Sequence, residues 1–124
     1  MSDHTDEIRR LNDLARTAPE SVNATWALSR GVVLLLTGGD DTPRGTAQAV
    51  TRFAQLKSAI QHFADWPQGD GPYREHDFGA FTLFGARLFF KLDYYHPEHD
   101  AHAPVPSNIE LCRRVLTVMC ADEA

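Results

Sequence analysis

Residues 72–95 read PYREHDFGAFTLFGARLFFKLDYY, two runs of strand-forming side chains that meet at Gly85-Ala86. Apolar and polar positions alternate along both runs, as they do in strands that bury one face. Glycine tolerates the positive φ that a two-residue type II′ turn requires at its first position, so the stretch predicts a β-hairpin. The predicted register sets three pairs opposite one another: Phe81 with Phe90, Leu83 with Leu88, and Gly79 with Leu92.

The two faces of this predicted hairpin differ in character. One is apolar and should join the core through Phe81, Leu83, Leu88 and Phe90. The other is mixed and carries Phe78, Ala80, Thr82, Phe84, Arg87, Phe89, Lys91, Asp93 and Tyr95. Moving the turn to Phe84-Gly85 would shift the register by two residues, which leaves every side chain on its face. The mixed face is either covered by a helix or, with Tyr94 and Tyr95, forms an exposed aromatic patch of the kind that proteins bind.

The remaining elements follow from apolar periodicity. A helix is expected near residues 6–18, with a solvated side made of Arg9, Arg10, Asp13 and Arg16. The β-branched run Val32–Leu36 predicts a buried strand. Thr42-Pro43 looks like a helix start, and a helix from about 43 to 65 should bury Val50, Phe53, Leu56, Ile60 and Phe63. A last helix is expected after Ser107, with Ile109, Cys112, Val115, Leu116 and Met119 facing inward. The sequence therefore predicts an α+β fold in the order helix, strand, helix, hairpin, helix, with a small sheet of about three strands packed by helices.

Length and composition describe one folded domain spanning residues 1–124. The chain is 43% hydrophobic and 23% charged, unlike disordered proteins. Its net charge of −5 disfavours direct binding to nucleic acid. The longest apolar run is far too short for a membrane span, and the acidic start of the chain does not resemble a secretory signal, so we expect a cytoplasmic protein. Cys112 and Cys120 are expected to be thiols, since a helix would hold them too far apart for a disulfide.

His76, Asp93 and Lys91 are the candidate catalytic residues. In the predicted register His76 lies opposite or diagonal to Asp93, and a carboxylate that fixes an imidazole tautomer is a common arrangement for general-base chemistry. Lys91 projects from the same face as Asp93 and could stabilise a developing negative charge. The alternative is a cross-strand polar network, with Lys91 and Asp93 as a salt bridge.

Metal binding is the other chemistry that we considered. Glu75, Asp77 and Asp93 are hard oxygen ligands, but alternation places Asp93 on the opposite face from the other two. The histidines at positions 96, 99 and 102 recur every third residue, but prolines in the same segment oppose a helix that would align their rings. We therefore predict no metal and no cofactor.

Three motifs resemble a bacterial family that is defined as a domain of unknown function: Glu75-His76-Asp77-Phe78-Gly79, Lys91-Leu92-Asp93-Tyr94-Tyr95 and Arg114-Val115-Leu116-Thr117-Val118-Met119. The resemblance implies an origin on plasmids and other mobile elements, near antirestriction and DNA-maintenance genes. The family pattern Asn-Asp-Pro-Tyr-Gly is replaced here by Gly69-Asp70-Gly71-Pro72-Tyr73-Arg74. The resemblance supplies no catalytic residues.

Acidity gathered around the hairpin, the nearby aromatic side chains and the family setting favour a non-enzymatic protein-binding module. Its specific form would be a mobile-element inhibitor of a host defence complex, of the anti-CRISPR or antirestriction type. An acidic surface can occupy a nucleic-acid channel by electrostatic complementarity. The expected binding residues are Glu75, Asp77, Tyr94, Tyr95 and Glu98. The alternative is a hydrolase or nuclease that uses the His76–Asp93 pair, with or without metal.

Overall fold

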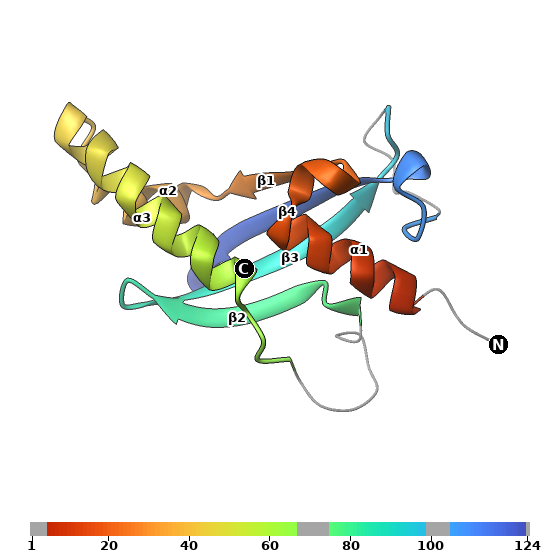
Figure 1. Cartoon of the computed structure of the whole chain (residues 1–124). Helices are drawn as coiled ribbons and strands as arrows, with labels where there is room; N and C mark the ends of the chain where they lie inside the picture. Colours follow the sequence, from red (N-terminus) through yellow and green to blue (C-terminus); the bar gives the residue numbers. More distant parts are fainter. Residues whose placement is uncertain (1–4, 67–74, 99–104, 124) are drawn as a thin grey trace.

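A computed structural model describes residues 5–66, 75–98 and 105–123. These residues form seven main elements (Figure 1): α1 (Thr5–Thr17), β1 (Ala24–Leu28), α2 (Arg30–Thr37), α3 (Pro43–Gln61), β2 (Phe78–Leu83), β3 (Ala86–Tyr95) and β4 (Arg113–Cys120). Short 3-10 turns cover Pro19–Val22, Ile109–Leu111 and Ala121–Glu123. The predicted helices at 6–18 and 43–65 are confirmed, although α3 ends at Gln61.

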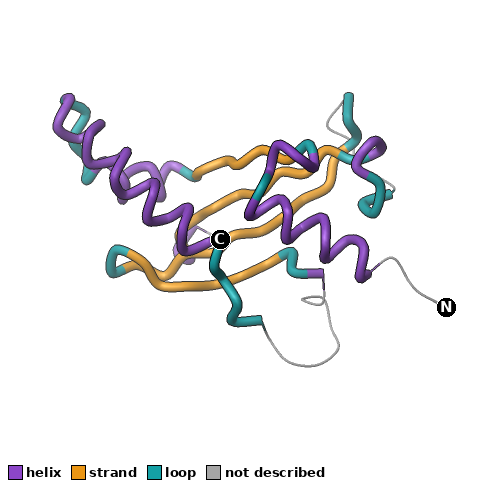
Figure 2. Tube along the Cα trace, viewed as in Figure 1, coloured by secondary structure: helices purple, strands orange, loops and turns teal. Residues whose placement is uncertain are grey.

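The strands form one mixed sheet in the order β1-β4-β3-β2 (Figure 2). β2 pairs antiparallel with β3, β3 pairs antiparallel with β4, and β1 joins the edge parallel to β4. The predicted α+β class is confirmed, but the sheet has four strands, because β1 and β4 join the hairpin in place of the single strand predicted at Val32–Leu36.

The hairpin is confirmed, whereas its predicted register is wrong by two residues. Leu83 pairs with Ala86 and Phe81 with Leu88, so the turn is Phe84-Gly85. Both turn residues have positive φ, 54° and 71°, which is the type I′ combination whose twist matches a two-stranded ribbon. The face assignment holds, because a shift of two residues preserves the alternation. Leu88 and Phe90 are fully buried, and Phe81 and Leu83 pack against the same core.

The predicted strand at Val32–Leu36 is wrong, since these residues lie in α2. Ser29 caps this helix by accepting a hydrogen bond from the Val32 amide, and Gly38 ends it in the left-handed conformation with φ 68°. Five apolar residues in a row fit a helix that is half buried as well as they fit a strand. The strand lies just before, at Ala24–Leu28.

The predicted last helix is also wrong, because Arg113–Cys120 form the inner strand β4. Arg114, Leu116 and Val118 are buried, and the residues between them are half exposed, which is the period of a strand. Cys112 and Cys120 are free thiols, as expected, although no helix separates them: Cys112 directly precedes β4, and Cys120 is its last residue.

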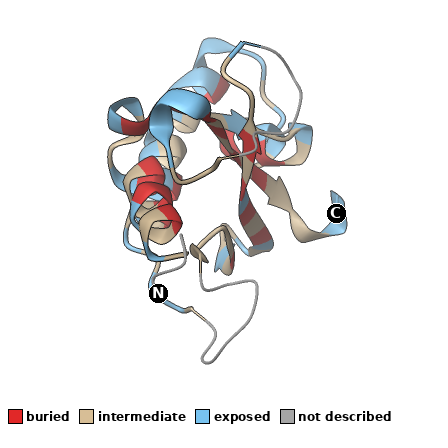
Figure 3. Ribbon diagram, turned by 90° about the vertical axis from the view of Figure 1, so that its right-hand side faces the viewer, coloured by how far each residue is buried: buried red, intermediate tan, exposed pale blue. Residues whose placement is uncertain are grey.

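The helices gather on one side of the sheet in the side-on view of Figure 3, and α1, α2 and α3 all contribute buried residues to the core that they form with the sheet. Leu56 and Ile60 of α3 are fully buried with Phe90 and Leu116 of the sheet, and α1 and α2 add to the same core. Val50, expected in the α3 stripe, is instead 69% exposed, because α3 extends past the edge of the sheet (Figure 1). No helix in the described ranges is long and apolar enough to cross a bilayer.

The end of the chain is fastened to the start of α2. The carboxylate of Glu123 accepts hydrogen bonds from the Ser29 hydroxyl at 2.6 Å, the Cys120 amide at 2.7 Å and the Gly31 amide at 3.0 Å. These contacts, with the Ser29 bond the strongest influence, lower the pKa of Glu123 to about 2. β4 is thereby tied to the helix that follows its parallel neighbour β1.

Candidate functional site

Residues 75–77 dock on α1. The Nδ1 atom of His76 lies 2.8 Å from Oδ1 of Asp13, and the amide of Asn12 donates to the main-chain oxygen of Glu75 at 3.0 Å. The predicted pairing of His76 with Asp93 is therefore replaced by a pairing with Asp13, a residue of the first helix. Because an ionised carboxylate only accepts hydrogen bonds, Nδ1 carries the proton.

The reason is local backbone geometry. His76 has φ 56° and precedes the first paired residue of β2, so the alternation of the strand does not reach it. Its ring turns toward the helices and stacks on Trp66, with centroids 3.8 Å apart and planes within 4°. Trp66 in turn makes an edge contact with Phe90, which lies on the buried face of the sheet. His76 thus shares a side with the core and not with Asp93.

Arg16 completes this cluster. Its guanidinium donates to Asp13 at 2.7 Å and to the main-chain oxygen of Ile60 at 2.9 Å, and it lies 5.0 Å from the centre of the Trp66 ring. Arg16 was predicted to face solvent, yet it is buried. The side chains of His76 and Asp13 remain 19% and 40% exposed, so the second imidazole nitrogen is the one left for chemistry.

A second network lies beneath Glu75. Asn12 donates to the Tyr94 hydroxyl at 2.8 Å and accepts from Nε of Arg114 at 2.8 Å, and the Tyr94 hydroxyl donates to the Glu75 carboxylate at 3.2 Å. Arg114 is fully buried, lies over the Tyr94 ring, and donates also to the main-chain oxygen of Pro106. Burial raises the pKa of the Tyr94 hydroxyl and lowers that of Arg114. Tyr94, proposed above as a binding residue, is therefore an interior residue.

The second face of the sheet carries none of the described helices. Phe78 and Phe89 contact each other across β2 and β3 at 5.2 Å between ring centres, and Tyr95 lies 5.2 Å from the guanidinium carbon of Arg113. The expected Lys91–Asp93 salt bridge is present at 3.6 Å on this face. We call this surface, made of the outward side chains of β1–β4, the open sheet face. The mixed face of the hairpin is thus left uncovered by the described elements except at Phe84, whose ring packs against the core and lies 5.2 Å from the guanidinium carbon of Arg52 on α3.

Carboxylates gather at the end of the hairpin where β2 begins and β3 ends. Burial raises the pKa of Asp77, and the nearby Glu75 and Asp93 carboxylates raise it further. Glu98 is exposed just beyond β3. The described residues include no group of three or more side chains placed to hold a metal. Of the three spaced histidines, His96 accepts from the Glu98 amide at 3.1 Å, and the other two lie outside the described residues.

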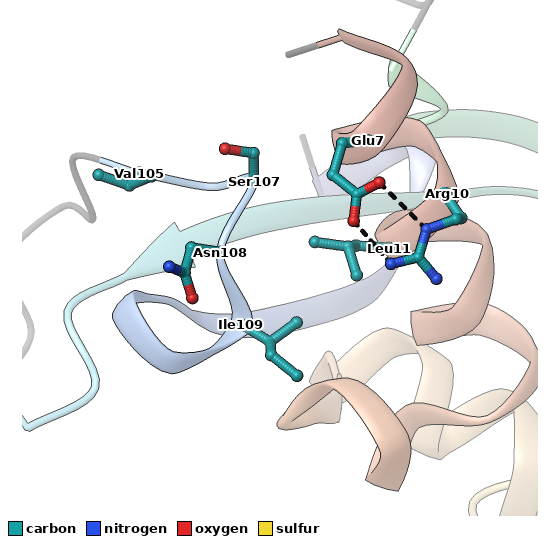
Figure 4. Close-up of a pocket in the computed structure, with 7 residues that line it drawn as sticks. All are labelled: Glu7, Arg10, Leu11, Val105, Ser107, Asn108 and Ile109. Carbon is teal, nitrogen blue, oxygen red and sulfur yellow. Dashed lines mark hydrogen bonds and ion pairs between the residues drawn. The ribbon is translucent and has the colours of Figure 1, made fainter.

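A groove of about 490 Å³ separates α1 from the segment at 105–109 (Figure 4). Glu7 and Arg10 border it on the helix, and Leu11 lies between the two sides. Glu7 accepts two hydrogen bonds from Arg10, at 2.6 and 3.2 Å, and this contact lowers the pKa of Glu7.

Sequence reasoning missed Asn12, Asp13, Arg16, Trp66 and Arg114. One signal was present in the buried stripe of α1. Asn12 directly follows Leu11 in this stripe, and Arg16 directly follows Ala15. Polar side chains on a buried stripe must find partners inside the protein. The polar residues in this stripe therefore indicated that α1 contributes side chains to a buried polar network.

Comparisons with known proteins gave one match. Residues 42–123 fit the model of the family described as "Protein of unknown function (DUF3768)". Neither the curated proteins nor the solved structures include a significant match to the chain. The matched segment contains α3, β2, β3 and β4, with the Glu75-His76-Asp77 and Lys91–Tyr95 motifs, and it covers well over half of the chain. The chain therefore belongs to the DUF3768 family.

Proposed function

We propose that this chain is a non-enzymatic protein-binding module that recognises its partner with the acidic end of the hairpin. The observation that carries the proposal is the gathering of Glu75, Asp77 and Asp93 at this end; burial raises the pKa of Asp77, and the two neighbouring carboxylates raise it further. A partner that brings cationic groups to this end would relieve that repulsion, and such complementarity also speeds association. Glu98 extends the same end into solvent.

A cationic surface of this kind is typical of a nucleic-acid channel. The specific form of the proposal is therefore inhibition of a nucleic-acid-binding host defence complex, either a restriction enzyme or a CRISPR effector, by a cytoplasmic protein from a plasmid or other mobile element. The acidic net charge of −5 supports this form. Glu75 contributes to the local potential, but its carboxylate is held by Tyr94 and is not expected to contact the partner directly.

The test is protection of an invading phage in host cells that carry either defence. Expression of the chain should raise the plating efficiency against one of them, and Asp77→Lys with Glu98→Lys should abolish the effect. Asp41→Lys is the matched control, because this exposed carboxylate lies in the turn before α3, at the far end of the molecule (Figure 1). Protection that survives the double reversal, or no protection against either defence, would count against the proposal.

A second candidate is hydrolysis, which the Asp13–His76 contact favours. With Nδ1 fixed by Asp13, the other ring nitrogen is arranged as a general base in the manner of a catalytic dyad. This reading predicts that Asp13→Asn and His76→Gln each remove the biological effect while the chain stays folded. Full activity of His76→Ala would eliminate it.

A further inference from the structure

Cations accompany the aromatic rings of the open sheet face. Arg87, Phe89 and Lys91 follow one another on this face of β3, with neighbours about 7 Å apart. At the other end of the strand, the guanidinium of Arg113 lies 5.2 Å from the Tyr95 ring. Phe78 of β2 adds a third ring beside Phe89. From Phe89 to Tyr95, six strand residues or about 20 Å, the two rings are separated by Lys91 and the carboxylate of Asp93, with Arg113 beside Tyr95.

The outward side chains of the strands carry a net positive charge, unlike the whole chain. Three of them are cations, Arg87, Lys91 and Arg113, and one is a carboxylate, Asp93. Beyond the strands, Asp122 and Glu123 line the same hollow as Arg87, and Asp77 lies close enough to Asp93 to be influenced by its charge. Lys91 and Asp93 form a loose pair at 3.6 Å with side chains 47% and 40% exposed, so solvent screens their attraction and Lys91 can exchange partners at little cost. Local potential, rather than total charge, decides what a surface attracts.

The charges of the open sheet face indicate which kind of ligand could bind to it. A second copy of the chain would bring two positive faces together, which opposes stacking of the sheets. An anionic ligand complements the strand cations Arg87, Lys91 and Arg113, and flat groups that stack on the half-buried rings would gain most. We infer that the open sheet face binds single-stranded nucleic acid, with bases on Phe89 and Tyr95 and phosphates near Arg87, Lys91 and Arg113. Aromatic platforms interleaved with cations hold single strands without reading their sequence.

The test is fluorescence anisotropy of labelled oligo(dT) and oligo(U), of roughly 20 nucleotides each, with the full chain at about 50 mM salt. Binding should weaken with salt at a log–log slope of about −2, because roughly 0.7 counterions are released for each of three phosphates contacted. Phe89→Leu keeps an apolar side chain but removes the ring, and affinity should fall at least about 5-fold. Arg87→Ala should lower affinity and reduce the slope by roughly 0.7.

Lys57→Ala is the matched control, because this exposed lysine lies on α3, which packs on the other face of the sheet. It should leave both affinity and slope unchanged. The inference is overturned if neither oligonucleotide binds at micromolar concentrations, or if the control weakens binding as much as Arg87→Ala. It is also overturned if the chain sediments as a dimer that Phe89→Leu dissociates, because the face would then bind a second copy. Capture of a host protein that persists after nuclease treatment, without oligonucleotide binding, would overturn it too. The Asp77→Lys, Glu98→Lys variant changes none of these rings and cations. If it loses phage protection but still binds the oligonucleotides, the two proposals concern separate surfaces and can fail separately.

Discussion

Replacing Asn12 with alanine tests whether the buried network holds the two halves of the candidate site together. Asn12 is fully buried and makes three hydrogen bonds, one accepted from the charged Arg114 and two donated, to Tyr94 and to the main-chain oxygen of Glu75. Loss of the bond to a charged donor costs about 2 kcal/mol, and each neutral bond costs about 1 kcal/mol. Alanine is the better helix former and recovers about 0.5 kcal/mol.

The expected loss is therefore about 3.5 kcal/mol, a large share of the roughly 5–15 kcal/mol that stabilises a domain. For a chain of this length the melting temperature should fall by roughly 15 °C. Urea denaturation followed by circular dichroism measures the loss in free energy of unfolding directly. Gln55→Ala, at an exposed site on α3, is the control and should change it by less than about 0.5 kcal/mol.

A double-variant cycle with Arg114→Met separates the network from simple loss of volume. If Asn12 stabilises the protein chiefly by satisfying Arg114, the double variant should lose about 2 kcal/mol less than the sum of the single ones. A single-variant loss below about 1 kcal/mol, or strictly additive losses, would refute the assignment of Asn12 as the centre of the network.

Substitutions at three further positions test other parts of the fold. The pKa of Glu123 is lowered from its ordinary 4.5 to about 2, so its contacts stabilise the fold above pH 4.5 and are lost as the pH falls toward 2. The melting temperatures of the wild type and Glu123→Gln should therefore differ at neutral pH and converge in acid. Gly79→Ala should cost roughly 1–3 kcal/mol in urea denaturation, since a β-carbon there would collide with the Phe90 ring; an unchanged midpoint would mean that the ring can move. Gly85→Ala has open space around it but φ 71°, so about 1 kcal/mol of backbone strain is expected, and Gly85→Asn should recover part of it.

Short-range information was sufficient for the hairpin. A turn and two alternating strands are encoded within one stretch of sequence, and the parity of the alternation survived an error of two residues in register. The five apolar residues at 32–36 show no alternation or periodicity that would distinguish a strand from a helix. Their identity as a helix depends on Ser29 at one end and Gly38 at the other, and both signals are also common in turns beside strands.

β4 shows why inner strands are hard to recognise. Val115, Leu116 and Met119 fit a helical stripe, and Arg114 would have faced water on that helix. In the sheet Arg114 points into the core, where Asn12 and Pro106 satisfy it. A buried cation is costly unless its hydrogen bonds are met, so its position could be assigned only once its partners, 102 and 8 residues away, were in place.

The same dependence on distant partners explains the site. Glu75-His76-Asp77 lies within the segment that matches the family model, whereas Asn12 and Asp13 precede residue 42 and lie outside it. The first helix therefore supplies the carboxylate that sets the tautomer of His76 and the amide that holds Glu75, and the first strand supplies the parallel neighbour of β4. Different N-terminal segments on the same matched core would leave the motif in place but change what the imidazole can do. The Asp13–His76 contact thus joins a residue inside the matched segment to one outside it, and tests of His76 chemistry are most informative when the Asp13 variant is measured beside them.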